Sequence, residues 1–212
     1  MNKFSQRTAK DYNKFRAFFQ WLACDFCVGT FIKLMYDYSI EGKENIPKDE
    51  RFIVAANHIS GKDPFLLPFA LKMRIAFMAK EELFEKFFSQ KLMDWCGAFA
   101  VKRDKVAVST IKTALSIKDT DWMLGLFPQG TRDASERVEK ITKGFASFAK
   151  ATKTGILPVA IIGTDRKIKW PFCEKLTVKI GKVIPYSDNI EEMMTQWCSV
   201  ISEMTGKTYA LV

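Results

Sequence analysis

The only histidine of the 212-residue chain, His58, lies in a segment whose residue types suit proton transfer. The segment reads NHISGKDP and spans residues 57–64. Imidazole is the side chain best suited to move a proton near neutral pH. Four residues separate His58 from Asp63, and Gly61 permits the loop between them to turn tightly, so the carboxylate can return to the imidazole. Such a pair resembles the base and the orienting acid of a catalytic triad, with the nucleophile supplied as a hydroxyl group of the substrate.

The same spacing also fits a purely structural role. Asp63 directly precedes Pro64, and a carboxylate in that position is a common helix N-cap, with the proline as the first helical residue. Asp63 would then cap a helix beside a surface histidine. Spacing leaves both interpretations open, and it also leaves Ser60 open as a nucleophile.

Two further segments place cations after apolar runs. In FPQGTRD (residues 127–133), Gly130 permits close backbone approach, Thr131 offers a hydroxyl, and Arg132 has a planar fork that matches phosphate oxygens. In GAFAVKRD (residues 97–104), Lys102 and Arg103 together suit an anionic headgroup. The alternatives are a strand-ending turn with an exposed arginine and a solvated basic turn.

Alternating apolar runs and amphipathic stretches predict an α/β fold with a largely parallel central sheet flanked by helices. Strands are expected at residues 52–56, 75–79, 99–101, 124–127, 156–163 and 176–180. Helices are expected at residues 64–72, 83–95, 106–117, 143–153 and 190–205. His58 follows the first of these strands, where an open α/β sheet usually places its ligand crevice.

Residues 15–40 are rich in Phe, Trp and Leu but contain Arg16, Asp25, Lys33 and Asp37, so they do not supply the twenty apolar residues of a spanning helix. They predict amphipathic helical structure, with two helices meeting near Gly29 as one arrangement. Its apolar face would lie in a membrane interface or pack on the protein's own core. We therefore divide the chain into an amphipathic helical segment (residues 1–40) and an α/β domain (residues 41–212).

The net charge of +9 favours an anionic partner, which is a nucleic acid, a lipid surface or a phosphorylated substrate. Nucleic acid is disfavoured because no reading motif is present and the basic residues are spread along the chain. Five scattered cysteines and a polar N-terminus without a secretory signal indicate a reduced, cytosol-facing protein. We expect the C-x-x-C pair, Cys24 and Cys27, to be buried thiols, and we expect no metal site because a lone histidine has no carboxylate cluster beside it.

Taken in order, NHISGKD, VKRD, FPQGTRD and ILPVAII resemble the four sequence blocks of the glycerolipid acyltransferases, above all the bacterial 1-acyl-sn-glycerol-3-phosphate acyltransferases. The resemblance runs from about residue 40 to residue 184, and residues 15–40 resemble the family's N-terminal membrane-docking helices. It implies that His58 is the general base, that Asp63 holds its tautomer, and that Arg103, Arg132 and less strongly Lys102 bind the acceptor's phosphate. Gly130 and Thr131 would shape the cradle, Pro158 would line the pocket, and Lys143 would add a cation.

The resemblance implies transfer of a fatty acyl group from acyl-CoA or acyl carrier protein to the free hydroxyl of lysophosphatidic acid, giving phosphatidic acid in phospholipid biosynthesis. No cofactor is implied. The enzyme would lie at the cytoplasmic face of the cell membrane, monotopic or peripheral, against an anionic surface. The alternatives are another lysophospholipid or lipid acceptor, and a non-catalytic basic membrane-binding module.

One residue departs from the family pattern. Gln129 stands where the third block usually has Glu. An amide keeps hydrogen bonding but carries no charge, so we expect Gln129 to have a structural role and no part in proton transfer.

Overall fold

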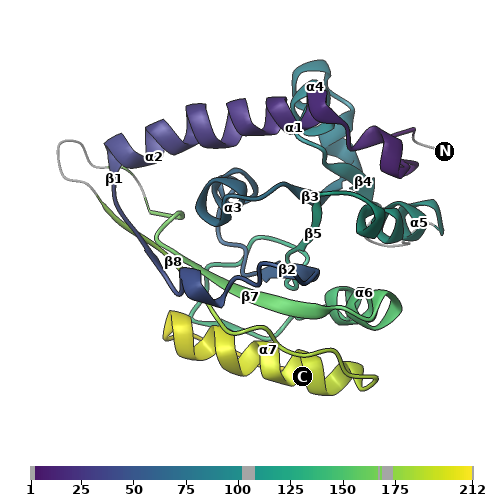
Figure 1. Cartoon of the computed structure of the whole chain (residues 1–212). Coiled ribbons are helices and arrows are strands. Elements are labelled where there is room, and N and C mark those ends of the chain that lie inside the picture. Colours follow the sequence, from purple (N-terminus) through teal and green to yellow (C-terminus); the bar gives the residue numbers. More distant parts are fainter. Residues whose placement is uncertain (1–2, 102–107, 167, 169–173, 212) are drawn as a thin grey trace.

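A seven-stranded sheet with the order β1-β8-β7-β2-β5-β3-β4 forms the centre of the molecule (Figure 1). The computed structural model describes residues 3–101, 108–166, 168 and 174–211. Neighbouring strands pair in parallel except β7 and β8, which confirms the predicted α/β fold with a largely parallel sheet. The strands are β1 (Tyr36–Glu41), β2 (Phe52–Ala56), β3 (Ile75–Lys80), β4 (Phe99–Val101), β5 (Met123–Leu126), β7 (Gly155–Ile162) and β8 (Glu174–Ile180). A separate parallel pair joins β6 (Arg137–Val138) to β9 (Thr208–Tyr209).

Helices cover both faces of the sheet. The bounds are α3 (Asp63–Leu71), α4 (Phe87–Trp95), α5 (Val108–Ser116), α6 (Gly144–Thr152) and α7 (Ile190–Thr205), with short 3-10 turns at η1 (Lys3–Ser5), η2 (Ala9–Asp11), η4 (Lys43–Asn45), η5 (Glu81–Phe84) and η6 (Ile117–Asp119). Side chains of α5, α6 and α7 fill the core on one face, and α3 with the N-terminal helix fills the core on the other.

Strand β2 contributes to both cores because successive side chains of a strand point to opposite faces. Ile53 and Ala55 belong to the α7 side, where the indole N–H of Trp197 also donates to the carbonyl oxygen of Ala55 at 3.0 Å. Val54 belongs to the α3 side and is fully buried. A strand covered on both faces in this way reads in sequence as a continuous apolar run.

The N-terminal helix is continuous from Lys14 to Met35 and lies along the outside of α3 (Figure 1). It consists of α1 (Lys14–Gln20), a wider π-helical stretch η3 (Trp21–Val28) and α2 (Gly29–Met35), with helical backbone angles at both junctions. Two separate helices meeting near Gly29 are therefore not what forms. The prediction that residues 15–40 are helical is also wrong for residues 36–40, which belong to the edge strand β1 and pair with β8.

By length and composition alone, Lys14–Met35 is long and apolar enough to cross a membrane, which its charged residues did not suggest; that it does not span stays a prediction. Two of its charges are engaged by the rest of the protein: Arg16 pairs with Asp94, and Asp25 pairs with Lys72. In the same helix Cys24 is buried but Cys27 is exposed, so the expectation of two buried thiols is wrong for Cys27.

Two residues fix the long helix to the domain. The side-chain amide of Gln20 donates to the carbonyl oxygens of Ile75 and Cys96, both at 2.8 Å, and accepts from the Ile75 N–H at 3.1 Å. Gly29 faces the buried ring of Phe69 on α3, and a β-carbon built on Gly29 would lie 2.5 Å from a ring carbon. The missing side chain is therefore what lets the two helices approach.

We expect Gly29→Ala to lower the free energy of unfolding by about 1–3 kcal/mol, because the added methyl group overpacks against Phe69. The matched control is Gly144→Ala at the start of α6, where a β-carbon meets nothing within 4 Å. The control should be neutral or gain about 0.5–1 kcal/mol from helix propensity. Urea unfolding followed by tryptophan fluorescence measures both, and an equal response of the two variants would contradict the close packing.

Candidate active site

The site is built around Asp63, whose side chain is fully buried. One carboxylate oxygen, Oδ2, accepts from the backbone N–H groups of Ile59 and Ser60, both at 2.8 Å, and lies 2.9 Å from Nδ1 of His58. The other, Oδ1, accepts from the hydroxyl of Thr164 at 2.6 Å. The carboxylate therefore organises the loop that precedes α3. The N-cap prediction is wrong, since Asp63 is itself the first residue of α3 and the N-cap is Lys62.

His58 is held with one ring nitrogen engaged and the other open. Oδ2 of Asp63 already accepts from two backbone N–H groups, so it acts as an acceptor towards Nδ1 of His58 as well, and Nδ1 carries the proton that is donated to it. Nε2 then has its lone pair free, and among the described residues nothing hydrogen-bonds to it. The ring stacks on Phe127 with a centroid distance of 4.1 Å, and Phe127 stacks on Phe77 at 5.2 Å. The imidazole is thus fixed in tautomer and in plane, as a general base requires.

Gln129 joins the loop of His58 to the FPQGTRD turn. Its side-chain oxygen accepts from the backbone N–H of His58, and its side-chain N–H donates to the carbonyl oxygen of Asp133 at 2.9 Å. Asp133 in turn donates its backbone N–H to the carbonyl oxygen of His58 at 2.8 Å. Gln129 is buried, and its side chain accepts through the oxygen and donates through the N–H. A carboxylate in its place could donate only if it were protonated. This geometry supports a structural role for Gln129.

Arg132 lies next to the His58 loop. A β-carbon built on Gly61 would lie 3.6 Å from Nη1 of Arg132, so the guanidinium lies over that glycine. Arg132 and Thr131 are exposed, and within the described part of the chain Arg132 has no hydrogen bond or ion pair. Gly130 has φ +68° and closes the turn by donating to the carbonyl oxygen of Phe127 at 2.9 Å. The predicted phosphate cradle is therefore brought beside the predicted base.

The other predicted residues fall in several places. Lys102 and Arg103 lie outside the described residues. Lys143 follows Thr142, which donates its hydroxyl to the carbonyl oxygen of Pro128 at 2.8 Å. Pro158 lies in the middle of β7, opposite Ala55 of β2.

Ser60 has a structural role in the loop, because its hydroxyl accepts from the Lys62 N–H at 3.3 Å. Hydrogen bonds from Ser135 lower the pKa of the Asp133 carboxyl. Across the described ranges, no group of three or more His, Cys, Asp or Glu side chains is placed to hold a metal ion.

Two contributors were missed in the sequence. Thr164 follows β7, the neighbour of β2 on the side away from Gln129, and its buried hydroxyl satisfies the second oxygen of Asp63. Asn57 pairs with the backbone of Ile161 in both directions, at 2.9 Å and 2.6 Å, and so fixes the start of the His58 loop to β7. The sequence could have identified them by position, because Asn57 and Thr164 each stand just beyond the end of a predicted strand.

Known proteins resemble this chain in sequence and in fold. The model of the family described as Acyltransferase matches residues 37–162, which include His58, Asp63 and Arg132. The 1-acyl-sn-glycerol-3-phosphate acyltransferase of Bacillus subtilis is 30% identical over 78% of this chain and 82% of its own length. That of Streptococcus pneumoniae is 32% identical over 68% of this chain, which spans about half (54%) of that relative's length. The crystal structure of the 1-acyl-sn-glycerophosphate acyltransferase PlsC of Thermotoga maritima is similar with a TM-score of 0.70 and 28% identity, over 89% of this chain and 77% of that chain.

Because the chain has a single histidine, the imidazole signals in a nitrogen-15 NMR spectrum belong to His58 alone. We expect the neutral ring to carry its proton on Nδ1, the opposite of the form that free histidine prefers in water. Asp63→Asn should lose this preference, because an amide can present a donor where the carboxylate only accepted. A neutral Nε2–H form in the wild-type chain would contradict the assigned geometry.

Proposed function

Since this chain belongs to the Acyltransferase family, we propose that it transfers a fatty acyl group from a thioester to the free hydroxyl of 1-acyl-sn-glycerol-3-phosphate, giving phosphatidic acid. The observation that carries this proposal is the pairing of His58 with the fully buried Asp63, which leaves Nε2 without a hydrogen bond among the described residues, in a loop whose Gly61 lies under the guanidinium of Arg132. A base next to a phosphate-binding cation suits an acceptor that carries both a hydroxyl and a phosphate.

The reaction needs one proton carrier. Nε2 of His58 takes the proton of the acceptor hydroxyl while its oxygen attacks the thioester carbonyl carbon. The tetrahedral intermediate collapses, the carbon–sulfur bond breaks, and the imidazolium returns the proton to the departing thiolate. Asp63 stabilises the imidazolium and stays ionised, as the orienting carboxylate does in a catalytic triad.

Thr164 and Gln129 act through the pair and are positioning residues. The hydroxyl of Thr164 keeps Asp63 from turning away from the imidazole, because it engages the oxygen that faces away from the ring. Gln129 fixes the backbone N–H of His58 relative to the turn that carries Arg132, and the backbone N–H of Asp133 in that turn fixes the His58 carbonyl oxygen. The distance between base and phosphate site is thereby set by backbone hydrogen bonds, which matters because small misplacements cost rate.

We also propose that the protein docks on the cytoplasmic face of the cell membrane through the long helix. Both the acceptor and the product are lipids, and the helix exposes six large hydrophobic side chains: Phe15, Phe18, Trp21, Phe26, Phe31 and Leu34. Its attachment through Gln20, Arg16 and Gly29 favours a helix that lies in the interface along the domain. The net charge of +9 supports attraction to anionic headgroups.

His58→Ala should lower kcat by about 10²- to 10⁴-fold, the usual effect of removing a general base, while stability changes far less. The measurement is release of free thiol from acyl-CoA, and then from acyl carrier protein, with lysophosphatidate present. Acceptor-dependent release that survives in the variant would remove His58 as the base. No release from either donor in the wild-type chain would favour a non-catalytic membrane-binding module.

Arg132→Ala should raise the acceptor KM by about 10- to 100-fold, because a charge-assisted contact to phosphate is worth roughly 1.5–3 kcal/mol. The matched control is Arg137→Ala, since Arg137 is also exposed but pairs with Glu139, just beyond the end of its own strand. Lysophospholipids with a choline or ethanolamine headgroup should be poor acceptors for the wild-type chain. An unchanged KM for lysophosphatidate would count against the phosphate role.

A further inference from the structure

We propose that α4 is a second membrane-inserting element, which enters the same bilayer as the long helix and is held at a fixed position relative to it. This proposal rests on the membrane docking proposed above. It concerns the tip formed by η5 and α4, whose exposed apolar side chains are Leu83, Phe87, Phe88 and Leu92. We call these four residues the α4 tip.

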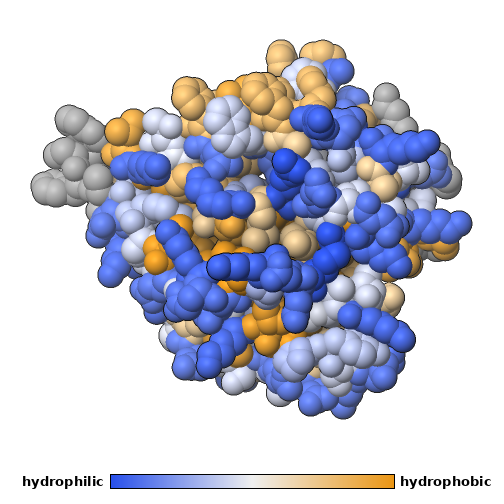
Figure 2. All heavy atoms as spheres, in the orientation of Figure 1, coloured by the Kyte–Doolittle hydropathy of each residue, from blue (hydrophilic) through white to orange (hydrophobic). Residues whose placement is uncertain are grey.

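Exposed apolar side chains are concentrated on two helical elements. Of the thirteen large hydrophobic side chains exposed in the described part of the chain, ten lie on the long helix or on the α4 tip. Phe88 is 86% exposed and Phe87 is 65% exposed, so neither stabilises the core. Figure 2 shows apolar side chains gathered along the edge of the molecule that the long helix and α4 occupy in Figure 1. Adjacent protruding phenylalanines are costly in water and favourable in a lipid interface.

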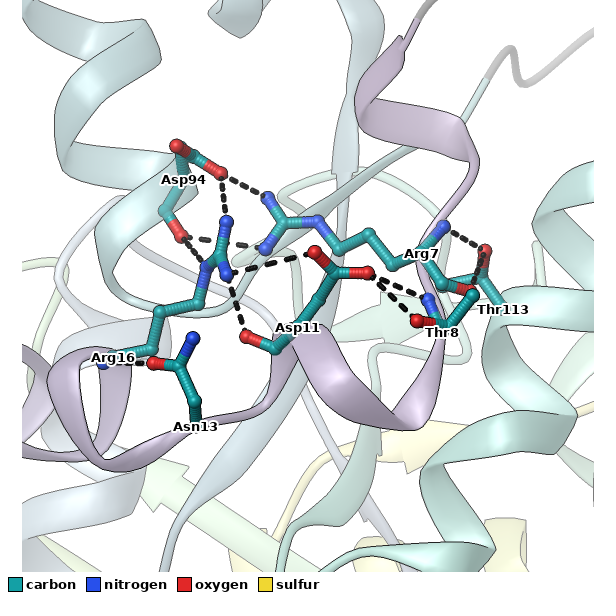
Figure 3. Close-up of polar contacts among 7 residues, drawn as sticks. All are labelled: Arg7, Thr8, Asp11, Asn13, Arg16, Asp94 and Thr113. Carbon is teal, nitrogen blue, oxygen red and sulfur yellow. Dashed lines mark hydrogen bonds and ion pairs between the residues drawn. The ribbon is translucent and has the colours of Figure 1, made fainter.

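A partly buried ion-pair cluster joins α4 to the chain on both sides of η2. One carboxylate oxygen of Asp94, in the last turn of α4, accepts from Nη2 of Arg7 at 2.9 Å and from Nη2 of Arg16 at 2.8 Å. The backbone carbonyl oxygen of Asp94 accepts from the same two arginines at 3.3 Å and 3.0 Å (Figure 3). The Arg7 side chain is only 3% exposed. Opening the cluster would leave the buried Arg7 without its partner, which is unfavourable, so α4 is held against the start of the long helix.

Aromatic contacts make the two elements one continuous surface. Trp95, the last residue of α4, packs against Phe15 and Phe19 of the long helix with centroid distances of 5.9 Å and 4.6 Å. Phe15 is itself exposed, so the apolar surface of the long helix runs directly into that of α4. A partner that covers the exposed side chains of the long helix therefore also contacts those of α4.

The charges at the margin of this surface favour a lipid bilayer as the partner. Lys91 places its ammonium group 5.7 Å from the ring centres of both Phe87 and Trp95, and Lys86 is exposed at the start of α4. Lysines beside aromatic rings keep their charged ends at the headgroup level while their stems cover apolar surface. The companion helix also has the length and composition of a membrane helix.

The test is co-sedimentation of the full chain with vesicles of phosphatidylcholine and phosphatidylglycerol. The variant Phe87→Ser/Phe88→Ser should lower the vesicle partition coefficient by about 10- to 100-fold, because two rings no longer leave water. The matched control is Leu211→Ser, an exposed apolar residue beyond β9, and it should leave partition unchanged. A third variant, Phe18→Ser/Trp21→Ser, tests the long helix alone.

The outcomes separate this proposal from the docking on which it rests. Loss of partition in both helix variants supports two inserting elements. Loss only in Phe18→Ser/Trp21→Ser overturns the role of α4 and leaves docking by the long helix intact, and loss in neither overturns both. If the wild-type chain self-associates without vesicles and Phe87→Ser/Phe88→Ser abolishes that, the surface contacts a second copy and the bilayer proposal is overturned. Acyl transfer to a water-soluble short-chain acceptor should be unchanged in every variant, since none touches the site.

Discussion

The carboxylate of Asp63 is the constraint on which the site depends. A charge removed completely from water is tolerated only if protein groups replace its hydration. The loop after β2 folds back so that the backbone N–H groups of Ile59 and Ser60 donate to it, and the hydroxyl of Thr164, just beyond the end of the neighbouring strand β7, donates to its other oxygen. Once those donors are in place, the imidazole of His58 occupies the remaining hydrogen-bonding position of the carboxylate. The orientation of His58 therefore results from satisfying a buried charge.

Much of the fold could be predicted because its strands are buried on both faces and its helices carry regular apolar patterns. The bounds expected for residues 52–56 and 190–205 are those of β2 and α7. Strand β1 was missed because Tyr36–Glu41 continues the aromatic composition of the helix before it, and its strand character comes only from pairing with β8. That partner is 138 residues away, beyond the reach of any local pattern.

The candidate site also has a part that the sequence predicts and a part that it does not. The ends of β2 and β5 were predictable from apolar runs, so His58 and the turn containing Arg132 were each expected directly after a strand. The contacts between them were not, because Gln129 joins the two loops through a side chain whose neighbours are set by the strand order. Thr164 gave no chemical signal, since one hydroxyl after a strand is ordinary until a buried carboxylate lies 2.6 Å away.

The pairing of β1 with β8 also has a consequence for the order of events during synthesis. The long helix leaves the ribosome early, but the strand that fixes its C-terminal end is made 138 residues later. Until β8 is made, the apolar face of the long helix is not covered by a completed sheet, and β1 at the end of the helix has no strand to pair with. A nascent chain in this state needs a surface or a chaperone to cover the helix. The bilayer on which the protein is proposed to work is such a surface, so attachment can precede folding.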